Sequence, residues 1–219
     1  MTGRQPPVGE VRVVDDVAGA FAALVADEAP QTMALSGGGT ARRCYERLAA
    51  TSGLNWSSVT VLFGDERWVP VDAPDSNEGM ARRALLDAVR PAEVCSLRGA
   101  APTLEEAAEA YDAVIAALPA LDLVHLGLGD DGHTASLFPG SPALEVDDRQ
   151  VVATGDDAHP HPRLTLTFPA IARFTTAVVT VSGAEKAQAW RRLCNGDDIP
   201  AARIRANSLI WLVDPSVTT

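Results

Sequence analysis

Short apolar runs alternate along this chain with longer segments whose apolar positions recur every three or four residues. The first run covers residues 11–14, and Asp15 or Asp16 can then cap a helix with apolar residues at that spacing. Further runs of strand length lie at residues 32–35, 59–63, 121–128, 151–154, 164–168, 177–181 and 209–213. The pattern predicts strands that alternate with helices.

Capping signals support the predicted helices. Ser76 and Asn77 precede one helical stretch, and Thr103 with Glu106 three residues later matches a capping box. Pro169 suits the first turn of a brief helix. Strands that alternate with helices favour an α/β fold of the Rossmann-like layered kind, with a mainly parallel sheet flanked by helices.

Composition narrows the class of protein further. The 219 residues are 47% apolar, so we expect one domain over residues 1–219, with residues 1–10 flexible. The net charge of −11 argues against nucleic acids and anionic membranes as partners, because both attract clustered Lys and Arg. Three cysteines without a C-x-x-C pair indicate buried thiols. No signal peptide or membrane-spanning run is evident, so we expect a cytoplasmic protein. By default we expect a monomer.

A glycine loop follows the second predicted strand. Parallel α/β sheets bind ligands outside the carboxyl ends of their strands, and SGGGT at residues 36–40 lies at such an end, before a helix. Its backbone N–H groups and the helix dipole can hold a phosphate, although a tight strand-to-helix turn would look the same. The loop lacks both the ending of a Walker loop and the spacing of a dinucleotide-binding loop.

A charged segment, GDERWVP at residues 64–70, follows the third predicted strand. It places Asp65, Glu66 and Arg67 in succession. Because alternation sends neighbouring side chains to opposite sides, all three cannot serve one site. The alternative is a surface cluster of ion pairs, but the adjacent Trp68 favours an ordered and partly buried loop.

The stretch LGLGDDGHTASLFPG at residues 126–140 is the most informative. Glycines, two carboxylates and His133 follow an apolar strand, and small residues that can start a helix come next. An imidazole titrates near neutrality and can take a proton from water, while Asp131 can orient the ring or stabilise its cation. The plainer alternative is a histidine and an aspartate that cap a helix.

The other histidines are weaker candidates. His125 lies within an apolar strand, and His159 and His161 alternate with prolines in a predicted loop. No histidine in the chain has the spacing of a zinc motif such as H-E-x-x-H. We therefore predict no catalytic metal.

Two cations are candidates for binding an anion. Lys186, in GAEKA, is the only lysine of the chain, in which arginine otherwise supplies the positive charge. A compact ammonium near a glycine turn suits a phosphate oxygen, although a solvated helix face would also accommodate it. Arg163, at the start of a predicted strand, is the second candidate.

Five segments in a fixed order resemble the 6-phosphogluconolactonase family: SGGGT, GDERWVP with SN after it, GLGDDGHTASLFPG, PRLTLTFP and GAEKA. The resemblance covers the chain from about residue 30 to 190, and the histidine segment is its most specific part. It implies hydrolysis of 6-phospho-D-glucono-1,5-lactone to 6-phosphogluconate, the second step of the oxidative pentose phosphate pathway. It also implies that no metal or organic cofactor takes part.

The same resemblance implies roles for individual residues. His133 would activate the water that attacks the lactone carbonyl, Asp131 would tune it, and Arg67 would stabilise negative charge or bind the phosphate. The residues implied in binding the substrate or its phosphate are Ser36, Gly37, Gly38, Thr40, Asp65, Arg163 and Lys186. A covalent acyl-enzyme lacks its usual signature, because the chain contains no G-x-S-x-G elbow.

Two other functions stay open. A sugar-phosphate deaminase or isomerase of the wider superfamily shares the glycine loop, an aspartate at the position of Asp65 and the DGH segment. Deaminases resemble I-A-F-N-E after the histidine, which puts a ring-opening glutamate where this chain has Phe138. A sensor of sugar phosphates would keep the binding loop without the chemistry, and the retained His133 and Asp131 argue against it.

Overall fold

The computed structural model describes residues 7–155 and 160–218 of the chain. Within these residues, seven strands form one sheet in which every pair of neighbours is parallel. In order across the sheet they are β1 (Glu10–Val13), β10 (Ser208–Val213), β9 (Thr176–Val181), β6 (Leu123–Gly127), β2 (Thr32–Leu35), β3 (Thr60–Phe63) and β5 (Glu93–Val94). The expected α/β class with a mainly parallel sheet is confirmed.

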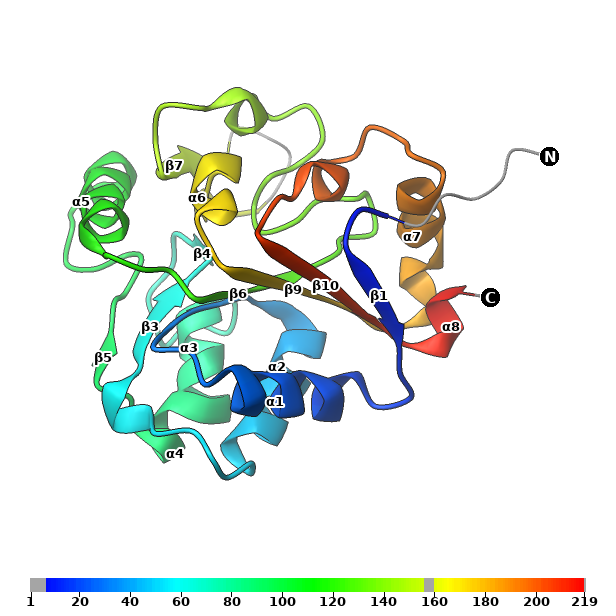
Figure 1. Ribbon diagram of the computed structural model, residues 1–219. Helices are drawn as coiled ribbons and strands as arrows, with labels where there is room; N and C mark the ends of the chain where they lie inside the picture. The colour runs from blue at the N-terminus through cyan, green and yellow to red at the C-terminus, as the bar shows by residue number, and fades with distance from the viewer. Residues whose placement is uncertain (1–6, 156–159, 219) are drawn as a thin grey trace.

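Helices cover both faces of this sheet, as a parallel sheet requires, because its strands are apolar on both sides. The α-helices are α1 (Val17–Glu28), α2 (Gly38–Ala49), α3 (Asn77–Ala81), α4 (Asp87–Val89), α5 (Leu104–Ala117), α6 (Phe168–Ala172), α7 (Ala187–Cys194) and α8 (Pro215–Thr218). A π-helical turn, Arg82–Leu86, joins α3 to α4. Figure 1 shows α1 to α4 gathered on one face of the sheet and α5, α6 and α7 on the other.

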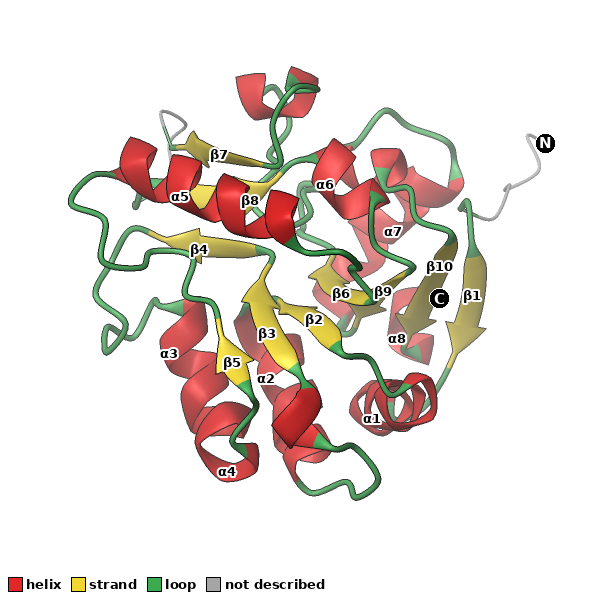
Figure 2. Cartoon of the chain, turned by 60° about the vertical axis from the view of Figure 1, so that its left-hand side comes forward, coloured by secondary structure: helices red, strands yellow, loops and turns green. Residues whose placement is uncertain are grey.

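A second, antiparallel sheet lies beside the first. Its strands, in order, are β4 (Asp65–Arg67), β8 (Arg163–Leu166) and β7 (Val151–Thr154), and α5 packs against it (Figure 2). The sequence suggested a loop for the charged segment that forms β4. This expectation is wrong because the backbone of β4 pairs with β8, a distant partner that the local pattern cannot reveal.

The predicted helix caps are confirmed. The side chains of Asp16, Ser76 and Thr103 each accept a hydrogen bond from the backbone N–H three residues further on, at the starts of α1, α3 and α5. Pro169 lies in the first turn of α6, as expected. These caps fix where the helices begin relative to the strands that precede them.

Two local expectations are corrected. The small residues after His133 do not start a helix, because Thr134 and Leu137 pair in an isolated bridge and Ala135 has a φ of +49°. Of the three cysteines, Cys44 is buried, but Cys95 and Cys194 are partly exposed.

The N-terminal segment is only partly described. Residues 1–10 are expected to be flexible, and residues 1–6 lie outside the described part of the chain. The Val8 carbonyl accepts a hydrogen bond from Trp211 Nε1 at 2.9 Å, and Glu10 begins β1. None of the described helices has the length and apolar character needed to cross a membrane.

Glu66 ties β4 to the start of α3. Its carboxylate, buried at 2% exposure, accepts hydrogen bonds of 2.7–2.9 Å from the backbone N–H groups of Arg67, Asn77 and Glu78 and from Ser76 Oγ. Burial raises the pKa of Glu66 above its ordinary value, against the lowering effect of these hydrogen bonds. One carboxylate therefore fixes the turn that brings Arg67 and Asn77 together.

Replacing Glu66 by Ala should lower the free energy of unfolding by about 3 kcal/mol or more, because several buried donors lose their acceptor. Denaturant unfolding at neutral pH measures the change. Glu109→Ala, at an exposed position of α5, is the matched control and should change stability by about 0.5 kcal/mol or less. Equal losses in the two variants would contradict the role of Glu66.

Candidate active site

A cavity of about 460 Å³ opens at the carboxyl edge of the large sheet, beyond the ends of β2, β6 and β9. Its volume is within the range of small-molecule sites. Nine of the ten residues that the sequence predicts for the site line it: Ser36, Gly37, Gly38, Thr40, Asp65, Arg67, His133, Arg163 and Lys186. The tenth, Asp131, contacts His133 from behind. The topology thus brings the predicted segments together.

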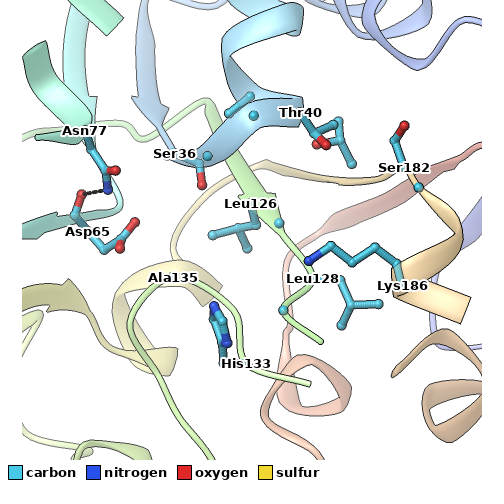
Figure 3. Close-up of a pocket in the computed structure, with 18 of the residues that line it drawn as sticks. Ser36, Thr40, Asp65, Asn77, Leu126, Leu128, His133, Ala135, Ser182 and Lys186 are labelled. Carbon is cyan, nitrogen blue, oxygen red and sulfur yellow. Dashed lines mark hydrogen bonds between the residues drawn. The ribbon is translucent and has the colours of Figure 1, made fainter. Parts of the chain in front are cut away.

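The glycine loop between β2 and α2 forms one wall of this cavity (Figure 3). Gly38 has a φ of +92°, a conformation that favours glycine. A Cβ on Gly37 would collide with the side chain of Asn77. Gly37 is the N-cap of α2 and has no side chain that could accept hydrogen bonds from the first N–H groups of the helix. These N–H groups, together with the helix dipole, can therefore stabilise an anion.

His133 is held by Asp131 in the loop after β6. Oδ1 of Asp131 accepts a hydrogen bond from the His133 backbone N–H at 2.9 Å and lies 2.6 Å from Nδ1 of the ring. Burial raises the pKa of Asp131, but these hydrogen bonds and the charge of His133 outweigh it, so the pKa lies below its ordinary value. Because Nδ1 is engaged by a carboxylate, Nε2 is the ring nitrogen left to accept a proton.

Packing also fixes the imidazole of His133. The ring of Phe138 lies 4.6 Å from it between centroids. A Cβ on Gly129 would collide with the imidazole, and the Gly129 N–H donates to the His133 carbonyl at 2.8 Å. Figure 3 shows the ring directed into the cavity. The candidate base is therefore oriented before any ligand binds.

Asp65, Glu66 and Arg67 divide between two sides of β4, as their alternation predicts. Asp65 and Arg67 line the cavity, whereas Glu66 points to the start of α3. The buried carboxylate of Asp65 accepts a hydrogen bond from Ser136 Oγ at 2.7 Å. Its other lone pairs can accept hydrogen bonds from the hydroxyl groups of a ligand.

Asn77, which the sequence suggested as a helix cap and as part of the SN pair in the resemblance, also lines the cavity. Its Nδ2 donates to the Asp65 carbonyl at 2.9 Å, the bond drawn in Figure 3, and its Oδ1 accepts from Arg67 Nη1 at 2.5 Å. Arg67 Nη1 also donates to the Asp75 carbonyl at 2.9 Å. Asn77 therefore ties the guanidinium of Arg67 to the strand end that carries Asp65.

Arg163 and Lys186 reach the cavity from different elements. Arg163 lies opposite Arg67 in the register of β4 and β8, and its guanidinium lies 5.3 Å from the ring centroid of Phe138. Lys186 belongs to the 3-10 turn η4 (Ala184–Lys186) after β9, and its Nζ lies 2.5 Å from Asp130 Oδ1. An anion that binds Lys186 must compete with Asp130.

A buried polar network beneath the glycine loop joins Tyr45, His125 and Thr180. Tyr45 Oη accepts the Ser36 N–H at 2.6 Å and lies 2.9 Å from His125 Nδ1. His125 Nε2 lies 2.9 Å from Thr180 Oγ1 on β9. Burial lowers the pKa of His125 to about 3, so this ring is neutral near pH 7. The network anchors the first residue of the loop to β6 and β9.

The burial of His125 should make the protein less stable in acid. The unfolded chain takes up a proton at His125 near the ordinary pKa of 6.5, whereas the folded protein does so only near pH 3. Stability therefore falls as the pH drops below about 6.5, by up to about 1.4 kcal/mol per pH unit from this residue. Unfolding free energies measured from pH 7 to pH 4 should fall less steeply for His125→Gln, and parallel curves would refute this account.

His161 is outside the site. His161 Nε2 lies 3.2 Å from Asp75 Oδ2, and His161 does not line the cavity. His159 lies outside the described residues. Across residues 7–155 and 160–218, no group of three or more His, Cys, Asp or Glu side chains is placed to hold a metal ion.

The fold and the cavity together define a class of protein. A glycine loop at a helix N-terminus and cationic side chains suit a small phosphorylated ligand. An imidazole held by a carboxylate in the same cavity suits proton transfer on that ligand. The class is therefore a parallel α/β protein whose cavity, at the carboxyl edge of its sheet, suits a small phosphorylated ligand.

Residues 10–211 match the family described as glucosamine-6-phosphate isomerases/6-phosphogluconolactonase, and the chain belongs to this family. The resemblance seen in the sequence is confirmed. Over 205 residues the chain is 42% identical to the 6-phosphogluconolactonase of Synechocystis sp., covering 87% of this chain and 84% of that protein. Over 206 residues it is 38% identical to that of Pseudomonas putida, covering 91% and 83%.

Solved structures of related proteins share the architecture. The 6-phosphogluconolactonase of Thermotoga maritima superposes with a TM-score of 0.83 at 26% identity, covering 94% of this chain and 99% of that chain. A monomeric glucosamine-6-phosphate deaminase gives 0.81 at 22% identity, covering 95% and 98%, a likeness of fold alone. Because the fold does not separate these activities, the choice between them depends on the residues of the site.

Proposed function

We propose that this protein hydrolyses 6-phospho-D-glucono-1,5-lactone to 6-phospho-D-gluconate, the second step of the oxidative pentose phosphate pathway. The observation that carries the proposal is one cavity that combines His133, bound to Asp131, with a glycine loop suited to phosphate. Curated 6-phosphogluconolactonases are 38–42% identical to this chain over 84–91% of its length. These relatives confirm the enzyme class expected from the sequence.

The proposed reaction begins with the attack of water on the lactone carbonyl. Nε2 of His133 takes a proton from the water as its oxygen bonds to the carbonyl carbon, and the π electrons move to the carbonyl oxygen. Asp131, 2.6 Å from Nδ1, stabilises the imidazolium that forms. The tetrahedral intermediate then expels the ring oxygen, which takes the proton from His133 and becomes a hydroxyl group. These steps use only water and groups of this chain.

Arg67 is proposed to stabilise the oxyanion of the intermediate. Its guanidinium is held by Asn77 Oδ1 and the Asp75 carbonyl, so it need not be reoriented as charge develops. Preorganised donors of this kind are among the largest contributions to catalysis of acyl transfer. Asn77 acts through Arg67 and is therefore a positioning residue.

The substrate is proposed to bind through its phosphate and hydroxyl groups. The residues assigned to the phosphate are Ser36, Gly37, Gly38, Thr40, Arg163 and Lys186. Lys186 would exchange Asp130 for a phosphate oxygen, which is a stronger partner because it carries more charge. Asp65 would accept a hydrogen bond from a sugar hydroxyl group, because its carboxylate faces the cavity and, among the described residues, has Ser136 as its one side-chain partner.

Deamination is the nearest alternative, and Phe138 argues against it. Where deaminases carry the ring-opening glutamate, this chain has a phenylalanine that is 4% exposed and packs on His133. An apolar ring supplies no proton for the opening of an amino sugar. A sensor without catalysis would gain nothing from the oriented pair of Asp131 and His133.

Replacing His133 by Ala should lower kcat for 6-phosphogluconolactone about 100-fold or more, because the attacking water loses its base. Acid release from freshly generated lactone measures the rate above spontaneous hydrolysis. His161→Ala removes a histidine outside the cavity and should keep the rate within about twofold. A full rate for the His133 variant would show that another group is the base.

Replacing Arg163 by Ala should raise KM about tenfold or more for the phosphorylated lactone, and far less for unphosphorylated gluconolactone, because a phosphate ligand is lost. Steady-state kinetics with both lactones measure the difference. Arg149→Ala, at an exposed position, controls for the loss of one positive charge. Equal effects on the two lactones would rule out a phosphate contact for Arg163.

A further inference from the structure

Arg43 lines the cavity, although the sequence did not mark it as a site residue. Its Nη2 lies 3.3 Å from both Thr40 Oγ1 and Ser182 Oγ. Thr40 belongs to α2 and Ser182 follows β9, so the guanidinium bridges two walls of the cavity. Figure 3 shows both hydroxyl groups on the side from which Lys186 enters.

Within the described part of the chain, Arg43 forms no ion pair. Lys186 pairs with Asp130 at 2.5 Å, and Arg42 pairs with Glu46 at 3.9 Å. Among the residues that the structure describes, no carboxylate oxygen lies within 4.0 Å of the Arg43 guanidinium nitrogens, which contact neutral hydroxyl groups instead. A cation without a counter-ion beside a helix N-terminus attracts an anion.

A second hollow beside the cavity shares Thr40, Arg43 and Ser182 with it. Three carboxylates belong to that hollow, those of Asp15, Asp16 and Asp214. They would repel a phosphate at the glycine loop, and Arg43 lines both hollows. The positive charge of Arg43 therefore offsets this repulsion, and its guanidinium also offers hydrogen-bond donors.

We propose that Arg43 is a further ligand of the substrate phosphate. The identity of the ligand rests on the proposed function. When phosphate binds, the guanidinium donates charge-assisted hydrogen bonds to its oxygens. Arg43 occupies only an acceptor position of the Thr40 hydroxyl group, so this hydroxyl can donate to the same phosphate.

The neighbouring arginine provides a matched control. Arg42 lies on the same helix and carries the same charge, but it does not line the cavity. Arg43→Gln should raise KM for 6-phosphogluconolactone about tenfold, against at most about twofold for unphosphorylated gluconolactone. Arg42→Gln should change KM for either lactone by no more than about twofold. Arg43→Lys should raise KM for the phosphorylated lactone less than Arg43→Gln does, because the positive charge is retained.

Binding of inorganic phosphate and of 6-phosphogluconate, measured by calorimetry, separates this inference from the lactonase proposal. Both ligands should bind about tenfold more weakly to Arg43→Gln than to Arg42→Gln, whether or not the protein turns over the lactone. If the two variants bound both ligands equally, the role of Arg43 would be overturned. If Arg43→Gln bound both ligands more weakly but the unaltered protein did not turn over the lactone, the lactonase proposal would fail and the role of Arg43 would stand.

Discussion

Because neighbouring strands of the large sheet are all parallel, their carboxyl ends lie along one edge. β2 pairs with β6 and β6 with β9, so the segments that follow these three strands must meet. These segments are the glycine loop, the loop of His133 and the turn that carries Lys186. No segment alone combines an anion site with a base. The cavity exists because the strand order makes them neighbours.

An acidic protein that binds an anion depends on local charge rather than net charge. The chain carries −11 overall, yet its cavity collects the guanidinium groups of Arg43, Arg67 and Arg163, the ammonium of Lys186 and the N-terminus of α2. Exposed charges more than about 10 Å away are largely screened at physiological ionic strength. The cavity cations therefore dominate the electrostatic field where the phosphate is proposed to bind, and distant carboxylates contribute little.

The sequence predicted features that have a local signal and missed those that depend on distant contacts. Strand cores and helix caps were found because apolar spacing and capping side chains act within a few residues. β4 was missed because its pairing with β8 outweighs a run of charged residues. Asn77 and Arg43 were missed because their roles depend on what lies across a turn or a cavity wall. A tight bridge at Thr134 replaced the expected helix after His133.

The conformation of the glycine loop depends on residues that lie outside the motif. Ser36 is held by Tyr45, which His125 and Thr180 support from β6 and β9, and Gly37 packs against Asn77. A short glycine motif by itself is therefore weak evidence for a phosphate site.

In the proposed mechanism, the reaction is selected at a different place, the loop after β6. There, Phe138 covers one face of the His133 ring and Asp131 engages its Nδ1, which leaves Nε2 as the atom that can accept a proton. A deaminase needs a second acid near its substrate, and this position holds an apolar ring instead. Proteins that share one backbone can thus differ in reaction through a few side chains beside the same histidine.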